Sequence, residues 1–130
     1  MGLFKSLFTN RSKEVVTSNI NWLVLNDLNQ LQEIQQASLK EPIFIFKHST
    51  RCGISRMVMK QFEKMFDDSM SKVKVYYLDL LNYRAISNEI GYTFQVQHQS
   101  PQLLVIKDKV AIATASHYDI TTVDLKNIII

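Results

Sequence analysis

The chain has 130 residues, enough for one compact domain with a single core, and 15 lysines and arginines against 12 acidic residues give it a formal net charge of +3. The basic residues are scattered, so the composition does not indicate a nucleic-acid partner. No apolar stretch approaches the ~20 residues of a membrane span. A single cysteine excludes an internal disulfide, and no signal peptide is recognisable. We therefore expect a monomer in the reducing cytoplasm.

The first third of the chain predicts an extension, a strand and a helix. Residues 1–18 are expected to form an N-terminal extension ahead of a domain over residues 19–130. Residues 22–25 predict a short strand, and Asn26 or Asp27 can cap the helix that follows. The apolar residues of this helix recur at helical spacing: Leu28, Leu31, Ile34 and Leu39.

The middle of the chain predicts two more strands, each followed by a helix. Residues 43–46 are a continuous apolar run, which is typical of a strand buried on both faces. The next helix has an apolar stripe made of Ile54, Met57, Val58, Phe62, Met65 and Phe66. Residues 73–80 are rich in β-branched and aromatic residues and predict a third strand. A helix centred on residues 85–90 is expected to end at Gly91, a plausible C-cap.

The last third predicts a hairpin and a final helix. Residues 103–106 and 110–114 are apolar runs joined by a short polar link, as in an antiparallel hairpin. Asp119 or Thr121 is expected to open a helix that continues through residues 123–129. Strands that alternate with helices and close with a hairpin predict an α/β fold, with a central mixed sheet between two helical layers.

Cys52 lies where the strand at residues 43–46 gives way to the helix that starts near Ile54. The first-turn amides of a helix lack intrahelical partners and carry partial positive charge, so they stabilise a thiolate. A free cysteine is commonly a small buried hydrophobe instead, but the polar and cationic neighbours of Cys52 favour a reactive thiol. Ser55 stands where a Cys-x-x-Cys motif would place its second sulfur. The sequence therefore predicts a monothiol redox centre.

Several charged or titratable side chains surround Cys52 in the sequence. Lys47, Arg51 and Arg56 could favour both the thiolate and an anionic thiol substrate, or they could be ordinary solvated charges. His48 could polarise the thiolate, or it could cap a backbone carbonyl at the strand end. The three histidines have no zinc-site spacing, so we expect no metal. A Cys–His hydrolase would need an oxyanion-hole motif and an acid partner, and neither is recognisable.

Four short motifs occur in order over about residues 20–130 and together resemble the YtxJ-type monothiol bacilliredoxins of the thioredoxin superfamily. They are Lys47-His48-Ser49-Thr50-x-Cys52-x-Ile54-Ser55, Arg84-x-x-Ser87-Asn88, His98-x-Ser100-Pro101-Gln102 and Ser116-His117-x-Asp119-Ile120-Thr121. The resemblance implies a thioredoxin-like three-layer α/β/α fold. It also implies a cytoplasmic thiol–disulfide oxidoreductase that removes bacillithiol from oxidised protein cysteines.

The resemblance assigns roles to individual residues. Cys52 would be catalytic, bacillithiolated proteins and bacillithiol would be the partners, and bacillithiol would be a co-substrate rather than a bound cofactor. An isolated X–Pro bond is mostly trans, but the resemblance implies that Pro101 is cis and faces the cysteine, with Ser100 offering backbone hydrogen bonds to a substrate strand. Residues that tune the thiolate or position the substrate would be His48, Thr50, Arg51, Gly53, Ser55, Ser100 and Pro101.

Gly53 departs from the family pattern, in which a proline normally follows the cysteine. Glycine is more flexible than proline at a first helical position and keeps its N–H, so the redox poise of Cys52 could differ from that of the family.

A second function stays open on the sequence alone: a non-enzymatic thioredoxin-like redox sensor or interaction module that is thiolated at Cys52.

Overall fold

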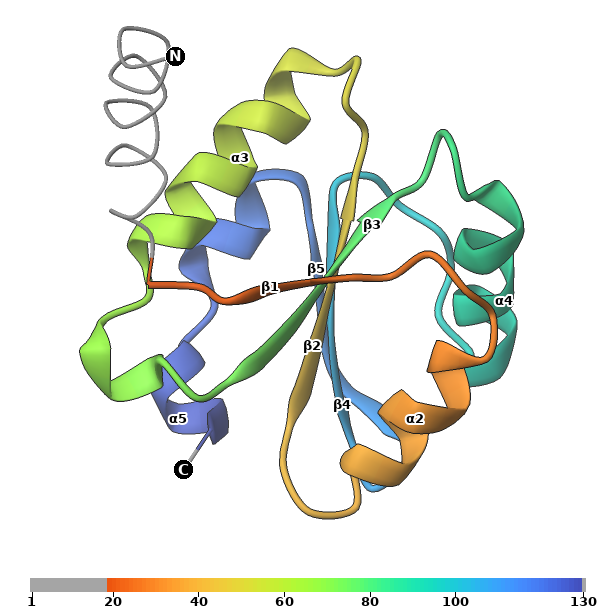
Figure 1. The fold of residues 1–130 in the computed structure, drawn as a ribbon. Coiled ribbons are helices and arrows are strands. Elements are labelled where there is room, and N and C mark those ends of the chain that lie inside the picture. The colour runs from red at the N-terminus through yellow and green to blue at the C-terminus, as the bar shows by residue number, and fades with distance from the viewer. Residues whose placement is uncertain (1–18, 130) are drawn as a thin grey trace, which may run out of the picture.

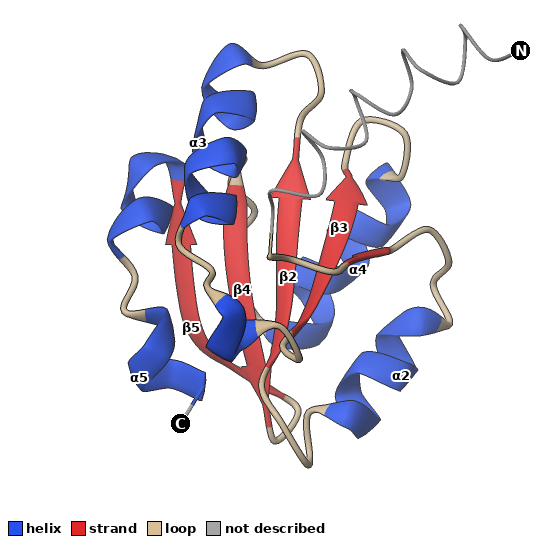
Figure 2. Ribbon diagram, turned by 60° about the vertical axis from the view of Figure 1, so that its left-hand side comes forward, coloured by secondary structure: helices blue, strands red, loops and turns tan. Residues whose placement is uncertain are grey.

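The computed structural model describes residues 19–129, and the predicted extension over residues 1–18 lies outside the described residues. A five-stranded mixed sheet, in the order β1-β3-β2-β4-β5, separates two helical layers (Figures 1 and 2). The strands are β1 (Trp22–Val24), β2 (Ile43–His48), β3 (Lys74–Asp79), β4 (Gln102–Lys107) and β5 (Val110–Ser116). The predicted α/β fold with a central mixed sheet is confirmed.

The helices divide between the two faces of the sheet. Figure 1 shows the sheet edge-on, with α3 and α5 on one side and α2 and α4 on the other. The α-helices are α2 (Gln30–Ala37), α3 (Gly53–Lys64), α4 (Arg84–Phe94) and α5 (Leu125–Ile129). Two short 3₁₀ helices, η1 (Asp68–Met70) and η2 (His117–Thr122), complete the fold. The side chain of Ile120 in η2 is buried in the same core cluster as α3.

The strand directions decide which loops meet. Strands β1, β3 and β2 run parallel, whereas β4 is antiparallel to both β2 and β5. The carboxyl ends of β2 and β3 and the amino end of β4 therefore lie at one edge of the sheet. In the register, His48 pairs with Asp79, and Lys47 pairs with Gln102.

The central strand β2 is buried on both faces, as its continuous apolar run predicts. Phe44 and Phe46 belong to the core under α3, and Ile43 and Ile45 belong to the core under α4. Side chains that alternate between two covered faces need no polar positions along the strand. This strand therefore holds the loop that follows it firmly in the middle of the molecule.

Two helix ends differ from the predictions. The predicted C-cap at Gly91 is wrong, because α4 continues to Phe94, and Gln95 caps it in the left-handed conformation at φ 55°. Gly91 instead makes room for the chain, since a Cβ there would lie 3.0 Å from the Val96 carbonyl oxygen. The first helix begins only at Gln30, so neither predicted cap residue is its N-cap.

The predicted C-terminal helix is two shorter elements, η2 and α5, with Val123 extended between them. The apolar stripes were also partly misassigned. Helical spacing alone does not show where a helix starts or which residues beyond its covered face stay in water. Four residues expected in the stripes are exposed: Leu28, Leu39, Ile54 and Met57.

Candidate active site around Cys52

Cys52 is the N-cap residue of α3 and is partly exposed. Its backbone is extended, with φ −103° and ψ 121°, and its carbonyl accepts the N–H of Arg56 at 3.1 Å. No side chain caps the helix. The amides of the first turn therefore keep their hydrogen-bonding capacity for a negative group beside Cys52, which is the setting that stabilises a thiolate.

Three hydrogen bonds hold the turn over residues 49–52. The Cys52 N–H donates to the Ser49 carbonyl at 3.1 Å. The Arg56 guanidinium donates through Nη1 to the Thr50 carbonyl at 3.0 Å, and the Ser49 N–H donates to Ser55 Oγ at 3.1 Å. Two side chains of α3, those of Ser55 and Arg56, therefore hold the turn against the helix.

Ser55 is fully buried, and its Oγ lies 2.7 Å from Nδ1 of the nearly buried His48. Burial lowers the pKa of the His48 imidazole; the Asp79 carboxylate opposes this effect and the Arg56 guanidinium adds to it. Asp79 Oδ2 accepts a hydrogen bond from Asn82 at 2.8 Å, while its buried Oδ1 has no hydrogen-bond partner within residues 19–129. The neutral form of His48 is therefore favoured near pH 7.

The grouping of a serine, a histidine and an aspartate does not make a hydrolase site. Ser55 has no exposed surface, so no substrate carbonyl can reach its hydroxyl. In a catalytic triad, moreover, the carboxylate orients the histidine through a hydrogen bond, and no such bond joins Asp79 to His48 in the described chain. The chemistry of this end of the sheet therefore centres on the thiol.

Lys47 contributes to the opposite face of the sheet. Its side chain is fully buried, and Nζ donates to the Ser87 carbonyl of α4 at 3.1 Å and lies 3.4 Å from His98 Nδ1. Burial lowers the pKa of Lys47 to about 8. The structure supports neither interpretation of Lys47, as a solvated charge or as a cation beside the thiol. Its ammonium is buried, and it lies on the α4 side of the sheet, because neighbouring side chains of a strand point to opposite faces.

The Ser100–Pro101 peptide bond is cis, as the resemblance implied. Pro101 is buried, and its carbonyl accepts the His117 N–H at 3.0 Å. Since Lys47 pairs with Gln102, continuing the antiparallel register by one residue places Pro101 beside His48. The loop that contains Ser100 therefore lies at the same edge of the sheet as the turn before Cys52.

A hollow of about 330 Å³ opens beside the turn and is lined by Thr50, Arg51, Leu81 and Asn82. It forms where the loops after the parallel strands β2 and β3 meet. Arg51 is exposed, and its guanidinium makes no ion pair or hydrogen bond with any residue of the described range 19–129. This cation is therefore free to bind a carboxylate from solution.

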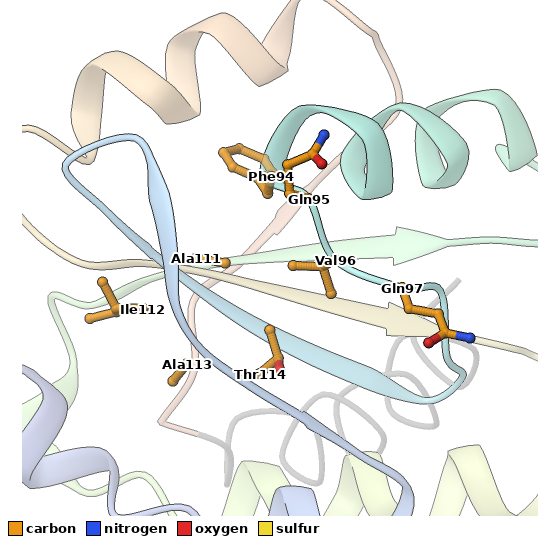
Figure 3. A pocket seen from close by; sticks show the side chains of 8 residues that line it. All are labelled: Phe94, Gln95, Val96, Gln97, Ala111, Ile112, Ala113 and Thr114. Carbon is orange, nitrogen blue, oxygen red and sulfur yellow. The ribbon is translucent and has the colours of Figure 1, made fainter.

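Two further hollows lack the means for thiol chemistry. One, of about 360 Å³, lies between the end of α4 and strand β5 and is lined by residues 94–97 and 111–114, none of them titratable (Figure 3). The other, of about 230 Å³, is lined by Glu41, Pro42, Ser69, Lys72, Val73 and Ile129. Neither is lined by a residue of the turn over residues 49–52.

The structure places five of the predicted residues around the start of α3: His48, Thr50, Arg51, Cys52 and Ser55. Two residues that the sequence did not indicate lie beside them. Asp79 is the last residue of β3 and pairs with His48 in the register. Asn82 follows in the next loop and lines the hollow. A signal for both was present, because the carboxyl ends of neighbouring parallel strands meet at one edge and commonly form the site.

Within residues 19–129, no helix is long and apolar enough to cross a membrane. The same residues contain no group of three or more His, Cys, Asp or Glu side chains that could hold a metal ion.

Comparison with known proteins gives a consistent assignment. A family model described as monothiol bacilliredoxin BrxC matches residues 24–125. A solved structure of a candidate oxidoreductase with a thioredoxin fold shares 25% identity with a TM-score of 0.69, covering 82% of this chain and 91% of its own. Thioredoxin from Malassezia sympodialis shares 22% identity and a TM-score of 0.62, with coverages of 80% and 84%. Spinach chloroplast thioredoxin f shares 16% identity and a TM-score of 0.62, with coverages of 82% and 83%.

Proposed function

The chain belongs to the monothiol bacilliredoxin family and is a thiol–disulfide oxidoreductase with the thioredoxin fold, and we propose that it removes bacillithiol from oxidised protein cysteines through Cys52 alone. Its partners would be bacillithiolated client proteins and bacillithiol, which acts as a co-substrate. The setting would be the reducing cytoplasm, where such mixed disulfides are transient.

The proposed exchange has two balanced steps. The Cys52 thiolate attacks the bacillithiol sulfur of the mixed disulfide, so that a Cys52–bacillithiol disulfide forms and the client cysteine leaves as a thiolate that takes a proton from water. A second bacillithiol thiolate then attacks the adduct, which releases the Cys52 thiolate and bacillithiol disulfide. No other oxidant or reductant is needed within one cycle.

This proposal rests on the residue at position 55, which is a serine and not a second cysteine. Cys52 is the only cysteine of the chain, and the side chain at position 55 is a fully buried serine whose oxygen is already hydrogen-bonded. An adduct on Cys52 therefore has no neighbouring thiol to expel it. A second molecule of low-molecular-weight thiol must do so.

The surroundings of Cys52 suggest how the two substrates are held. Bacillithiol carries malate carboxylates, and the unpaired guanidinium of Arg51 in the hollow beside the turn suits such an anion. Thr50 and Asn82 would complete the wall of this site. The backbone of Ser100, at the same edge of the sheet, would hydrogen-bond the client segment.

The proposal is tested by turnover. A client protein with one bacillithiolated cysteine is mixed with a catalytic amount of the chain and excess bacillithiol, and the free client thiol is measured with time. Many client molecules should be released per chain, and Cys52→Ser should be inactive. Stoichiometric thiolation without turnover would favour a redox sensor and refute the enzymatic proposal.

The role of Arg51 gives the same assay a second arm. Arg51→Gln should lower kcat/KM for the bacillithiol mixed disulfide by about three- to tenfold, as expected for one charge-assisted hydrogen bond at an exposed site. A mixed disulfide with uncharged 2-mercaptoethanol should be reduced at an unchanged rate. Arg84→Gln serves as the control, because Arg84 is also exposed but does not line the hollow. Equal losses with both substrates would remove Arg51 from anion binding.

A further inference from the structure

We propose that Ser55 is a positioning residue for Cys52. The Ser55 hydroxyl holds the turn over residues 49–52 by accepting the Ser49 N–H and donating its own proton to His48. This inference deepens the proposed exchange function and rests on it. Ser55, which stands where a Cys-x-x-Cys motif has its second sulfur, then has a structural role of its own.

The hydrogen positions are assigned by giving the buried hydroxyl proton an acceptor. Ser49 offers a backbone N–H at 3.1 Å, so Ser55 Oγ accepts there. The hydroxyl oxygen could accept a second bond, but its own proton has no acceptor among the described residues other than His48 Nδ1, which lies 2.7 Å away. His48 is then the tautomer protonated at Nε2, with Nδ1 as acceptor. Full burial of Ser55 leaves water no access to either bond.

The two bonds tie the turn to the rigid centre of the sheet. His48 is the last residue of β2, and its own carbonyl accepts the Leu80 N–H at 3.1 Å. The chain of contacts therefore runs from β2 through His48 and Ser55 to Ser49, whose carbonyl in turn accepts the Cys52 N–H at 3.1 Å. Loss of the Ser55 hydroxyl would leave the Arg56 guanidinium as the one side chain within residues 19–129 that holds the turn to α3, and would loosen the position of Cys52 relative to the first-turn amides.

The contact also gives a chemical reason for serine rather than cysteine at this position. A thiol is a weak donor and a weak acceptor, so a second sulfur would satisfy neither the Ser49 amide nor the His48 nitrogen as well. An amide buried without a good acceptor is destabilising. The site is thus built around a hydroxyl at position 55.

The chain offers a matched control in Ser38. This serine is also fully buried, and its Oγ also accepts a backbone N–H, from Lys109 at 2.9 Å, and donates to a carbonyl, of Gln35 at 2.6 Å. It lies at the other end of the sheet, beside the β4–β5 hairpin. Ser38→Ala and Ser55→Ala therefore remove equivalent hydrogen bonds, one far from Cys52 and one near it.

The experiment compares reactivity with stability. Wild type, Ser55→Ala, Ser55→Thr and Ser38→Ala are reacted at pH 7 with 2-hydroxyethyl disulfide, an uncharged probe, and the rate constant of adduct formation is followed by intact mass. The free energy of unfolding of each variant is measured in urea. Nitrogen NMR of His48 reports whether Nδ1 accepts a hydrogen bond.

Ser55→Ala should react about tenfold more slowly than wild type, Ser55→Thr should recover most of the rate, and Ser38→Ala should stay within twofold. The Nδ1 signal of His48 should change in Ser55→Ala alone. A wild-type rate in Ser55→Ala, with a stability loss like that of Ser38→Ala, would overturn the proposal.

A second variant covers the case in which Ser55→Ala does not fold. His48→Phe keeps a ring of similar size but removes the acceptor of the Ser55 proton, and it should slow the reaction by about threefold; an unchanged rate in folded His48→Phe would also overturn the proposal. Because the probe is neither bacillithiol nor a client, these results do not depend on the turnover assay. Failure of turnover with the expected probe rates would refute the proposed function only.

Discussion

Buried polar side chains are concentrated near the end of the sheet that carries Cys52. Six polar or charged residues are buried within residues 19–129, and only Ser38 lies at the far end. The other five are Lys47, His48, Ser55, Ser87 and Gln102. A buried polar group is tolerated when it is hydrogen-bonded, and each of these five has a hydrogen-bonding contact. Such groups fix the loops around the thiol in one arrangement.

Lys47 is the residue for which this arrangement is costly. Its pKa is about 8 in the folded chain against 10.5 when exposed, so the unfolded chain binds the proton more tightly between these two pH values. The free energy of unfolding should therefore rise as the pH increases from about 8 to 10.5. Below pH 8, Lys47 is charged in both the folded and the unfolded chain, and its full destabilising effect is present. Lys47→Met should stabilise the chain at pH 7 by on the order of 1–3 kcal/mol.

Urea unfolding at pH 7 and at pH 9.5 checks this expectation. The difference in stability between the two pH values should shrink in Lys47→Met. The control is Lys60→Met, an exposed position on α3, which should leave the difference unchanged. Equal pH dependence in wild type and Lys47→Met would show that Lys47 does not carry the effect.

At the level of elements, the start of α3 is suited to proline. Gly53 is the first residue of the helix, Cys52 before it is extended with ψ 121°, and a Cβ at position 53 would lie 3.7 Å from its nearest neighbour, the Arg56 guanidinium. Proline is favoured at a first helical position that follows an extended residue. Gly53→Pro should raise the free energy of unfolding by about 0.4–1 kcal/mol, since it restricts the unfolded chain.

Thermal or urea unfolding measures this change directly. Gly91→Ala provides the contrast, because a Cβ there would lie 3.0 Å from the Val96 carbonyl oxygen and should destabilise α4. A marked loss of stability in Gly53→Pro would mean that the Gly53 amide has an essential partner in the folded state.

Sequence reasoning identified the elements well and their ends poorly. The alternating order, the two-sided burial of β2 and the strand-to-helix position of Cys52 were predictable, because apolar patterning reports burial directly. The end of α4 was not, since Gln95 adopts a left-handed backbone that favours glycine. Gly91, which carried the expected signal, instead lets the chain that follows the helix pack closely against it at Val96.

The candidate site was predictable in its centre and not in its supports. Cys52 and Ser55 follow from spacing alone. The contact between His48 and Ser55 does not, because it spans a strand end, a turn and a helix start, and its existence depends on the direction of each side chain. Burial of Lys47 on the opposite face was also hidden, since the apolar run before it, at residues 43–46, has no polar position to mark the two faces.

For the whole molecule, the fold gathers three distant segments around one sulfur. The turn after β2, the loop after β3 and the loop before β4 share one edge of the sheet, because β3 is parallel and β4 antiparallel to β2 (Figure 2). Each contributes something different: the thiol with its helix, a hollow beside Arg51, and the cis-proline loop. We propose that this single sulfur carries the exchange without a second thiol from the protein.

Intact mass spectrometry follows this exchange on the protein itself. The chain is mixed with an equimolar bacillithiolated client and then with bacillithiol, and the mass of each species is followed. We predict one bacillithiol adduct, located on Cys52, release of reduced client, and return to the free thiol when bacillithiol is added, with no adduct in Cys52→Ser. The absence of any adduct on an accessible, ionised Cys52 would refute the proposed exchange.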